Sequence, residues 1–242
     1  RASRGSLLFI VGKDRRIIVF SFVFNFFLLS FLLSLVISSL FGFALRFLAI
    51  TDNQGDLYIY GSSSSSNYPT SFSSYSSINS GNTDIIVSHL SDDGASLIGS
   101  SYIGGNSDDG QNSINTNYGD TYRGEIYLDS ENSIYISSFS SSTNFPTSIN
   151  AFQNSNMGGQ DAVVFKLNND VSVLEWSTYI GSSSNDAAYG IRVNDDFETF
   201  VTGVAGIGFP MQVAGNYTTF NGGQYDGFIV KLNQNGTDVL AN

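Results

Sequence analysis

The sequence predicts an all-β protein: a β-propeller-like array of four-stranded antiparallel blades, about 2.5–3 of them, preceded by an N-terminal hydrophobic helix. Three observations carry this prediction. The chain beyond residue 50 repeats itself, each copy holds short runs of strand character, and the composition combines 25 Gly, 13 Tyr and 20 Phe with only 3 Pro. Abundant glycine and aromatic residues are typical of turn-rich β proteins.

The N-terminal part of the chain differs in charge from the rest. Residues 1–49 hold six of the ten basic residues and one acid, whereas residues 50–242 hold four basic residues and twenty acids. We therefore expect two parts: a basic N-terminus with a hydrophobic signal or anchor segment (1–49), and a set of β-propeller repeats (50–242). The overall charge of −11 makes nucleic acid an unfavourable partner.

An uncharged apolar run, 17–44, follows a cluster of basic residues. As a helix it would exceed the roughly 30 Å hydrocarbon core of a membrane, and it lacks the polar stripe of a soluble core helix. The positive-inside rule then keeps the N-terminus in the cytoplasm and exports residues 45–242. Cleavage after Gly42-Phe43-Ala44 and retention as an uncleaved membrane anchor both stay open. We expect an extracytoplasmic protein, either secreted or held at the cell surface.

The repeat keeps one constant offset between its first two copies. Residues 51–70 align with residues 128–147 without a gap, and residues 97–109 align with residues 174–186 at the same offset. The third copy follows at a shorter offset, since 161–167 aligns with 226–232, because residues 111–123 form an extra loop that the third copy lacks. The approximate bounds of the three copies are 51–127, 128–192 and 193–242.

Each copy contains alternating runs bounded by Gly, Asn, Asp and Ser, which is the pattern of strands and tight turns. Four strands per copy match the blade of a β-propeller. The serine-rich stretch 61–80 looks like a linker when taken alone, but it aligns with 138–157 and is predicted to be an ordered loop inside a blade. In the most complete copy the predicted strands are 125–128, 133–139, 161–167 and 174–180.

The length of the repeated part also predicts that further blades are missing. The repeated part, 51–242, is too short for three copies of the length of 51–127. Closed propellers use about four to eight blades. We therefore expect a fragment of a longer propeller, whose remaining blades contact exposed blade faces at one or both ends.

Several motifs resemble the SBBP β-propeller repeat, and together they extend the resemblance over roughly 51–242. The resemblance implies a large secreted or surface protein of the kind typical of Bacteroidetes, and it brings no catalytic residues with it. The motifs are Trp176-Ser177-Thr178-Tyr179-Ile180-Gly181, Asn144-Phe145-Pro146-Thr147, Ala151-Phe152-Gln153 and the stretch 158–167, GGQDAVVFKL.

The composition leaves few catalytic options. The chain has no Cys and a single His, His89, which excludes thiol chemistry, disulfides and any site built from two imidazoles. Catalysis by a Ser-His-Asp triad would have to use His89, which aligns with Lys166 and Lys231 and is expected at a solvent-facing strand position. We expect no catalytic residue and no cofactor-binding residue.

Asp and Asn oxygens crowd the turns, so Ca²⁺ is the metal that the sequence favours. The spacings do not match an EF-hand, and the turn-forming preference of these residues explains them without a metal. One acid per copy opens a strand, and these acids are interpreted as structural hydrogen-bond acceptors. The calcium candidates are Asp52, Asp56, Asp108 and Asp109, and the strand-opening acids are Asp84, Asp161 and Asp226.

Two classes of function compete. The favoured one is a non-enzymatic extracytoplasmic scaffold or adhesion module, which presents weak, multivalent contacts to glycans or proteins at the cell surface. The alternative is the propeller part of a polysaccharide-active hydrolase or lyase, with calcium as a cofactor, whose acids meet across a cleft. Trp176 stands where the first copy has Gly99, and it is either a local packing residue or an exposed aromatic for a glycan.

Overall fold

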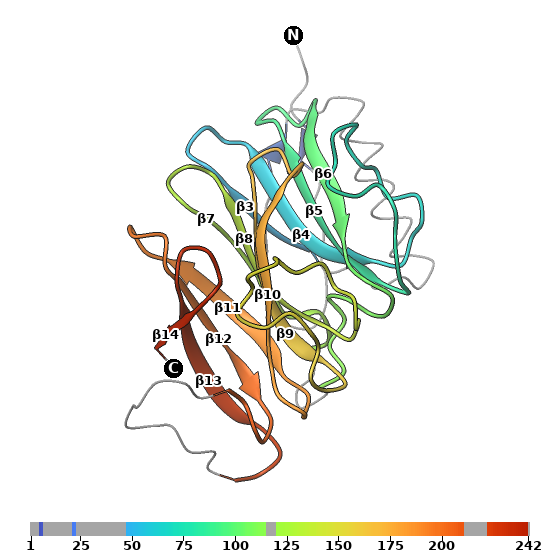
Figure 1. Ribbon diagram of the computed structural model, residues 1–242. Coiled ribbons are helices and arrows are strands. Elements are labelled where there is room, and N and C mark those ends of the chain that lie inside the picture. Colours follow the sequence, from blue (N-terminus) through green and yellow to red (C-terminus); the bar gives the residue numbers. More distant parts are fainter. Residues whose placement is uncertain (1–4, 7–20, 23–46, 115–119, 211–221, 242) are drawn as a thin grey trace.

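The computed structural model describes residues 5–6, 21–22, 47–114, 120–210 and 222–241. This part of the chain forms three four-stranded antiparallel sheets, here called sheets I, II and III, and contains no α-helix (Figure 1). The all-β prediction is therefore confirmed. Sheet I contains β3 (Phe47–Thr51), β4 (Leu57–Ser63), β5 (Asp84–Leu90) and β6 (Leu97–Ile103). Sheet II contains β7 (Glu125–Leu128), β8 (Ile134–Ser140), β9 (Asp161–Leu167) and β10 (Leu174–Ile180). Sheet III contains β11 (Ala187–Val193), β12 (Thr199–Ala205), β13 (Asp226–Leu232) and β14 (Val239–Ala241).

Each sheet is a meander in which consecutive strands pair with one another. The strands β4, β5 and β6 recur as β8, β9 and β10 at the constant offset of the first two copies, and β12, β13 and β14 follow at the shorter one. The four strands predicted for the most complete copy are all present. Strand β8 begins one residue later than predicted, because Asn132 has a φ of 61° and Ser133 closes the turn on the Asp129 carboxylate.

Sheet II lies between the other two sheets, as the order of the sheets along Figure 1 shows. Its strands alternate between two cores, since successive side chains of a strand point to opposite faces. Val163 and Phe165 belong to the core shared with sheet I, whereas Ala162 and Val164 belong to the core shared with sheet III. All four side chains are fully buried, and burial of each large apolar side chain stabilises the fold by about 1.5–3 kcal/mol.

Within the described part of the chain, the far face of sheet III has no comparable cover. Ile229 on β13 is 58% exposed. Its equivalents in the repeat, Val87 on β5 and Val164 on β9, are fully buried and lie in the cores that sheets I and II share with the next sheet. The same strand position is therefore enclosed twice and exposed once.

The serine-rich stretch within sheet I is an ordered loop, as predicted. Its backbone is tied to β6 by hydrogen bonds, because Ser71 N donates to Ser100 O (3.1 Å) and Tyr102 N donates to Ser76 O (3.0 Å). Sheet II repeats the arrangement in the aligned copy, where Ser148 N donates to Ser177 O (2.9 Å). Backbone pairing of this kind removes the cost of burying free peptide groups.

The extra loop lies between sheets I and II, where the sequence places it. It runs from the end of β6 to β7 and contains a short 3₁₀ turn, η1 (Asp120–Tyr122). The loop contributes Ile114, which is 1% exposed and packs with Phe139 and Ala187. In the third copy β11 begins at Ala187 without such a loop, which accounts for the shorter repeat.

Most of the predicted N-terminal hydrophobic helix, 17–44, lies outside the described residues. Two short strands, β1 (Gly5–Ser6) and β2 (Ser21–Phe22), pair antiparallel in this region. Among the residues that the structure describes, no helix has the length and apolar character needed to cross a membrane.

Candidate functional site

The turn edge between sheets I and II, here called the first junction, is closed by a polar network. Its residues are Asp52, Tyr58, His89, Asn132 and Asn169, drawn from β4, β5 and three turns. His89 Nδ1 donates to the Asn169 carbonyl oxygen (2.9 Å), and Asn169 Nδ2 donates to Tyr58 Oη (2.8 Å). Asn132 Nδ2 donates to Asp52 Oδ2 (3.1 Å). Turns of sheet II thus hold side chains of sheet I.

The prediction that His89 faces solvent is wrong. The residue is 2% exposed, and its ring stacks on Tyr58 with centroids 4.0 Å apart. Its Nε2 atom lies 3.3 Å from Asp56 Oδ2, so both ring nitrogens have partners. The strand pattern places His89 beside Tyr58, but the cover comes from Asn169, a residue 80 positions away. Such a contact cannot be read from alternation within one strand.

The equivalent edge between sheets II and III, here called the second junction, has different side chains. Tyr135 and Asp129 occupy the places of Tyr58 and Asp52, whereas Lys166, Phe197 and Gln234 replace His89, Asn132 and Asn169. The Lys166 ammonium pairs with Glu175 Oε2 (2.9 Å) and lies 3.9 Å from Asp129 Oδ2. It also lies 5.3 Å from the centre of the Tyr135 ring and 5.9 Å from that of Phe197.

This second network leaves buried polar atoms unsatisfied. Tyr135 is fully buried, and its hydroxyl has no hydrogen-bond partner among the described residues. Asp129 is 9% exposed, and its Oδ2 atom likewise accepts no hydrogen bond from the described part of the chain. Burial, together with the charge of Asp129, raises the pKa of Tyr135, so the phenol keeps its proton. The two groups interact with each other, since Asp129 is the polar side chain that acts on the Tyr135 hydroxyl.

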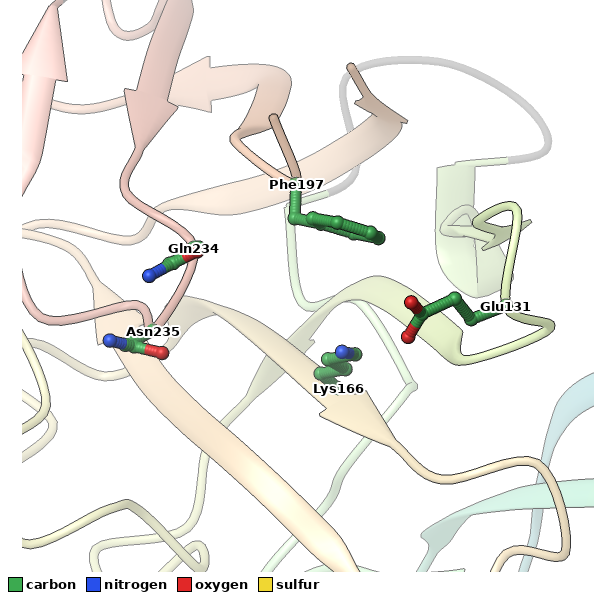
Figure 2. A pocket seen from close by; sticks show the side chains of 5 residues that line it. All are labelled: Glu131, Lys166, Phe197, Gln234 and Asn235. Atoms are coloured by element: carbon green, nitrogen blue, oxygen red, sulfur yellow. The ribbon is translucent and has the colours of Figure 1, made fainter. Parts of the chain in front are cut away.

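A depression with a cavity volume of about 140 Å³ opens at the second junction. Figure 2 shows its five lining side chains, which come from strand β9 and three turns that belong to sheets II and III. Phe197 provides an aromatic face, and the other four are polar. The lining residues are Glu131, Lys166, Phe197, Gln234 and Asn235.

One exchange of a small for a large residue distinguishes the two junctions. At the first junction a Cβ on Gly99 would collide with the Asp170 carbonyl oxygen, so the β9–β10 turn lies directly against β6. At the second junction Trp176 stands at the position of Gly99 and packs against Gly236, where a Cβ would lie 2.5 Å from Trp176 Cε3. Trp176 is 5% exposed. Of the two roles predicted for Trp176, local packing is confirmed.

The opposite edge of the sheets carries a repeated pair of buried acids. In the first copy Asp84 and Asp109 are fully buried and approach Gly104. A Cβ on Gly104 would lie 2.5 Å from the Asp84 carboxyl and 2.9 Å from Asp109 Oδ2. Asp109 Oδ2 also accepts hydrogen bonds from Gly105 N (2.7 Å) and from Ser142 Oγ of sheet II (2.8 Å). The pair therefore links sheets I and II.

The second copy repeats this pair as Asp161 and Asp186. Both are fully buried, and Asp186 Oδ1 accepts a hydrogen bond from Gly206 N of sheet III (2.8 Å). Burial raises the pKa of Asp109 and of Asp161 to about 6, with a smaller contribution from the partner acid of each pair. Burial also raises the pKa of Asp84 and of Asp186. Among the described residues, the Oδ1 atoms of Asp84, Asp109 and Asp161 have no hydrogen-bond partner.

The strand-opening acids act as predicted in two copies. Strands β5 and β9 begin at Asp84 and Asp161, which accept hydrogen bonds from Ser80 N (2.7 Å) and Met157 N (2.9 Å) respectively. These bonds close the turn before each strand. Asp226 opens β13 and is half-buried.

The four calcium candidates divide between the two ends of sheet I. Asp52 Oδ1 accepts hydrogen bonds from Gln54 N (2.9 Å) and Asp56 N (3.0 Å), which closes the β3–β4 turn. Asp108 and Asp109 follow β6 near Asp84, which pairs with Ser63 at the far end of β4. Across the described ranges, no three acidic or histidine side chains gather in a way that could hold a metal ion.

A scan against models of protein families finds no match to the chain, and a search of curated proteins finds no similar sequence. The resemblance to the SBBP repeat therefore stays a prediction from short motifs.

Proposed function

We propose that the chain is part of a non-enzymatic, extracytoplasmic scaffold or adhesion module built from SBBP-like propeller repeats. It would hold glycans or proteins through the turn edge of its sheets. The supporting observation is that one type of junction occurs twice with different side chains, closed by Asn169 in one case and open around Phe197 in the other. An array of such junctions can present several weak sites in series, and their binding then adds by avidity.

The proposal includes a propeller with further blades. Ile229 is exposed at the strand position through which sheets I and II each contact the next sheet. Because each blade of a repeat protein buries its faces against its neighbours, another sheet of the same kind would cover this surface. The remaining blades of a longer chain are thus the partner that fits the outer face of sheet III.

Retention without cleavage is the expected result when the full chain is mixed with a panel of polysaccharides. The measurement combines co-sedimentation with a count of new reducing ends, with and without a chelator that reports any need for Ca²⁺. Turnover that disappears in Asp84→Asn, Asp161→Asn or Asp226→Asn would contradict the proposal and favour a polysaccharide-active enzyme. Absence of retention on every polymer would remove glycans from the proposal.

Export is tested separately. A reporter enzyme that is active only outside the cytoplasm, fused after residue 60, is expected to be active because the uncharged segment 17–44 follows basic residues. The control is the same fusion without 17–44, which is expected to stay inactive. Cytoplasmic retention of the first fusion would contradict an extracytoplasmic location.

A further inference from the structure

We propose that the second junction is a subsite for one uncharged sugar residue, held against Phe197 by the polar side chains around it. This inference rests on the proposed scaffold function and names the ligand class of one of its sites. It starts from the comparison of two junctions that the repeat makes equivalent. At the first junction the protein's own side chains fill the space between the turns, whereas at the second junction a ligand would fill it.

The first step is that the protein's own groups do not complete the second junction. Asn169 satisfies both Tyr58 and His89 at the first junction. Its counterpart Gln234 is exposed and lines the depression instead. The buried Tyr135 hydroxyl interacts with the Asp129 carboxylate, as Tyr58 does with Asp52, and it does not line the depression. The amide that closes the first junction therefore has a counterpart on the exposed surface of the second, where it can meet a ligand.

The second step is the choice of residue at position 197. Phe197 has a φ of 59°, and its counterpart Asn132 has a φ of 61°. Asn tolerates this left-handed conformation well, whereas a bulky aromatic residue there is an outlier. The same turn position also has a positive φ at Gly55, Gly94, Val171 and Gly236, so the tight turn itself sets the conformation. What distinguishes position 197 is therefore its aromatic side chain. The half-buried ring is displayed toward the depression, as Figure 2 shows.

The third step is the chemistry of the lining. An aromatic face packs against the C–H face of a sugar ring, while the amides of Gln234 and Asn235 and the carboxylate of Glu131 can bind ring hydroxyls. The cavity volume of about 140 Å³ suits one ring rather than a longer segment. The carboxylates around Lys166 outnumber its single positive charge, so a neutral sugar fits better than an acidic one.

The decisive variant is Phe197→Asn, which places the residue of the first junction at the second. Because Asn suits a positive φ, the fold is expected to be kept, and unchanged thermal unfolding verifies this. The probes are glucose, galactose, mannose and N-acetylglucosamine, with glucuronate as the acidic comparison. Binding is read by saturation-transfer NMR on the full chain in a detergent without a sugar head group, and Asn132→Gly, which also suits a positive φ, serves as the matched control at the first junction.

The expected result is a signal from at least one neutral sugar in the wild type and in Asn132→Gly, reduced at least tenfold in Phe197→Asn. An undiminished signal in Phe197→Asn or a preference for glucuronate would overturn the proposal. If polysaccharides are retained but no neutral sugar gives a signal, the subsite is wrong while the scaffold function stands. If neither polysaccharide retention nor a sugar signal is observed, the subsite is wrong and glycans are removed from the proposed scaffold function.

Discussion

Replacing Val164 with aspartate is expected to destabilise the chain by about 4 kcal/mol or more, which is enough to unfold a domain of marginal stability. Val164 is fully buried in the core between sheets II and III. An aspartate there would bury a carboxylate with no partner, and this is among the most costly changes that a core can suffer. Urea unfolding followed by circular dichroism measures the effect.

The matched control is Ile229→Asp at the equivalent position of sheet III. Because Ile229 is 58% exposed, the free energy of unfolding is expected to change by less than about 1 kcal/mol. A similar loss of stability in both variants would contradict the stacked arrangement of the three sheets. It would mean that the outer face of sheet III is covered as well as the face of sheet II that holds Val164.

The full chain is expected to be more stable at pH 5 than at pH 7.5. Burial raises the pKa of Asp109 and of Asp161 from 3.8 to about 6 in the folded state. A raised folded pKa means that the folded chain holds protons which the unfolded chain has released. This contribution is fully present below pH 3.8 and is lost as the pH rises through about 6. The two carboxyls together account for about 3 kcal/mol between pH 5 and 7.5.

The variants Asp109→Asn and Asp161→Asn test the origin of this pH dependence. Asparagine resembles a protonated carboxyl, so each variant is expected to be more stable than the wild type at pH 7.5 and to show a flatter stability profile. Asp195→Asn, on an exposed turn, is the control and is expected to leave the profile unchanged. A profile that stays steep in the double variant would show that other groups cause it.

The fold could be predicted because it depends on local and repeated patterns. Alternating runs such as 161–167 define strands by themselves, and the constant offset between the first two copies shows that the runs form a unit. The offset also identified the serine-rich stretch 61–80 as ordered, although its composition alone indicates a linker. Its order comes from backbone hydrogen bonds to β6, which the aligned copy repeats.

The junctions could not be predicted because they depend on contacts between turns of different sheets. Whether His89 is exposed is decided by Asn169, and whether Lys166 borders a depression is decided by Phe197, Gln234 and Asn235 of sheet III. One signal was available for the acid pairs. Asp109 and Asp186 fall on one another in the alignment, as Asp84 and Asp161 do. The burial of both acids against one glycine emerges only from the packing.

The most direct test of the stacked architecture is hydrogen exchange of the backbone amides, read by mass spectrometry. Sheet II is enclosed by sheets I and III, whereas Ile229 is exposed on one face of sheet III, which no other described sheet covers. Strand β9 is therefore predicted to exchange slowest, and its equivalent β13 is predicted to exchange faster, because strands with fewer buried contacts open at a lower free energy. Exchange in β9 that is as fast as in β13 would contradict the account.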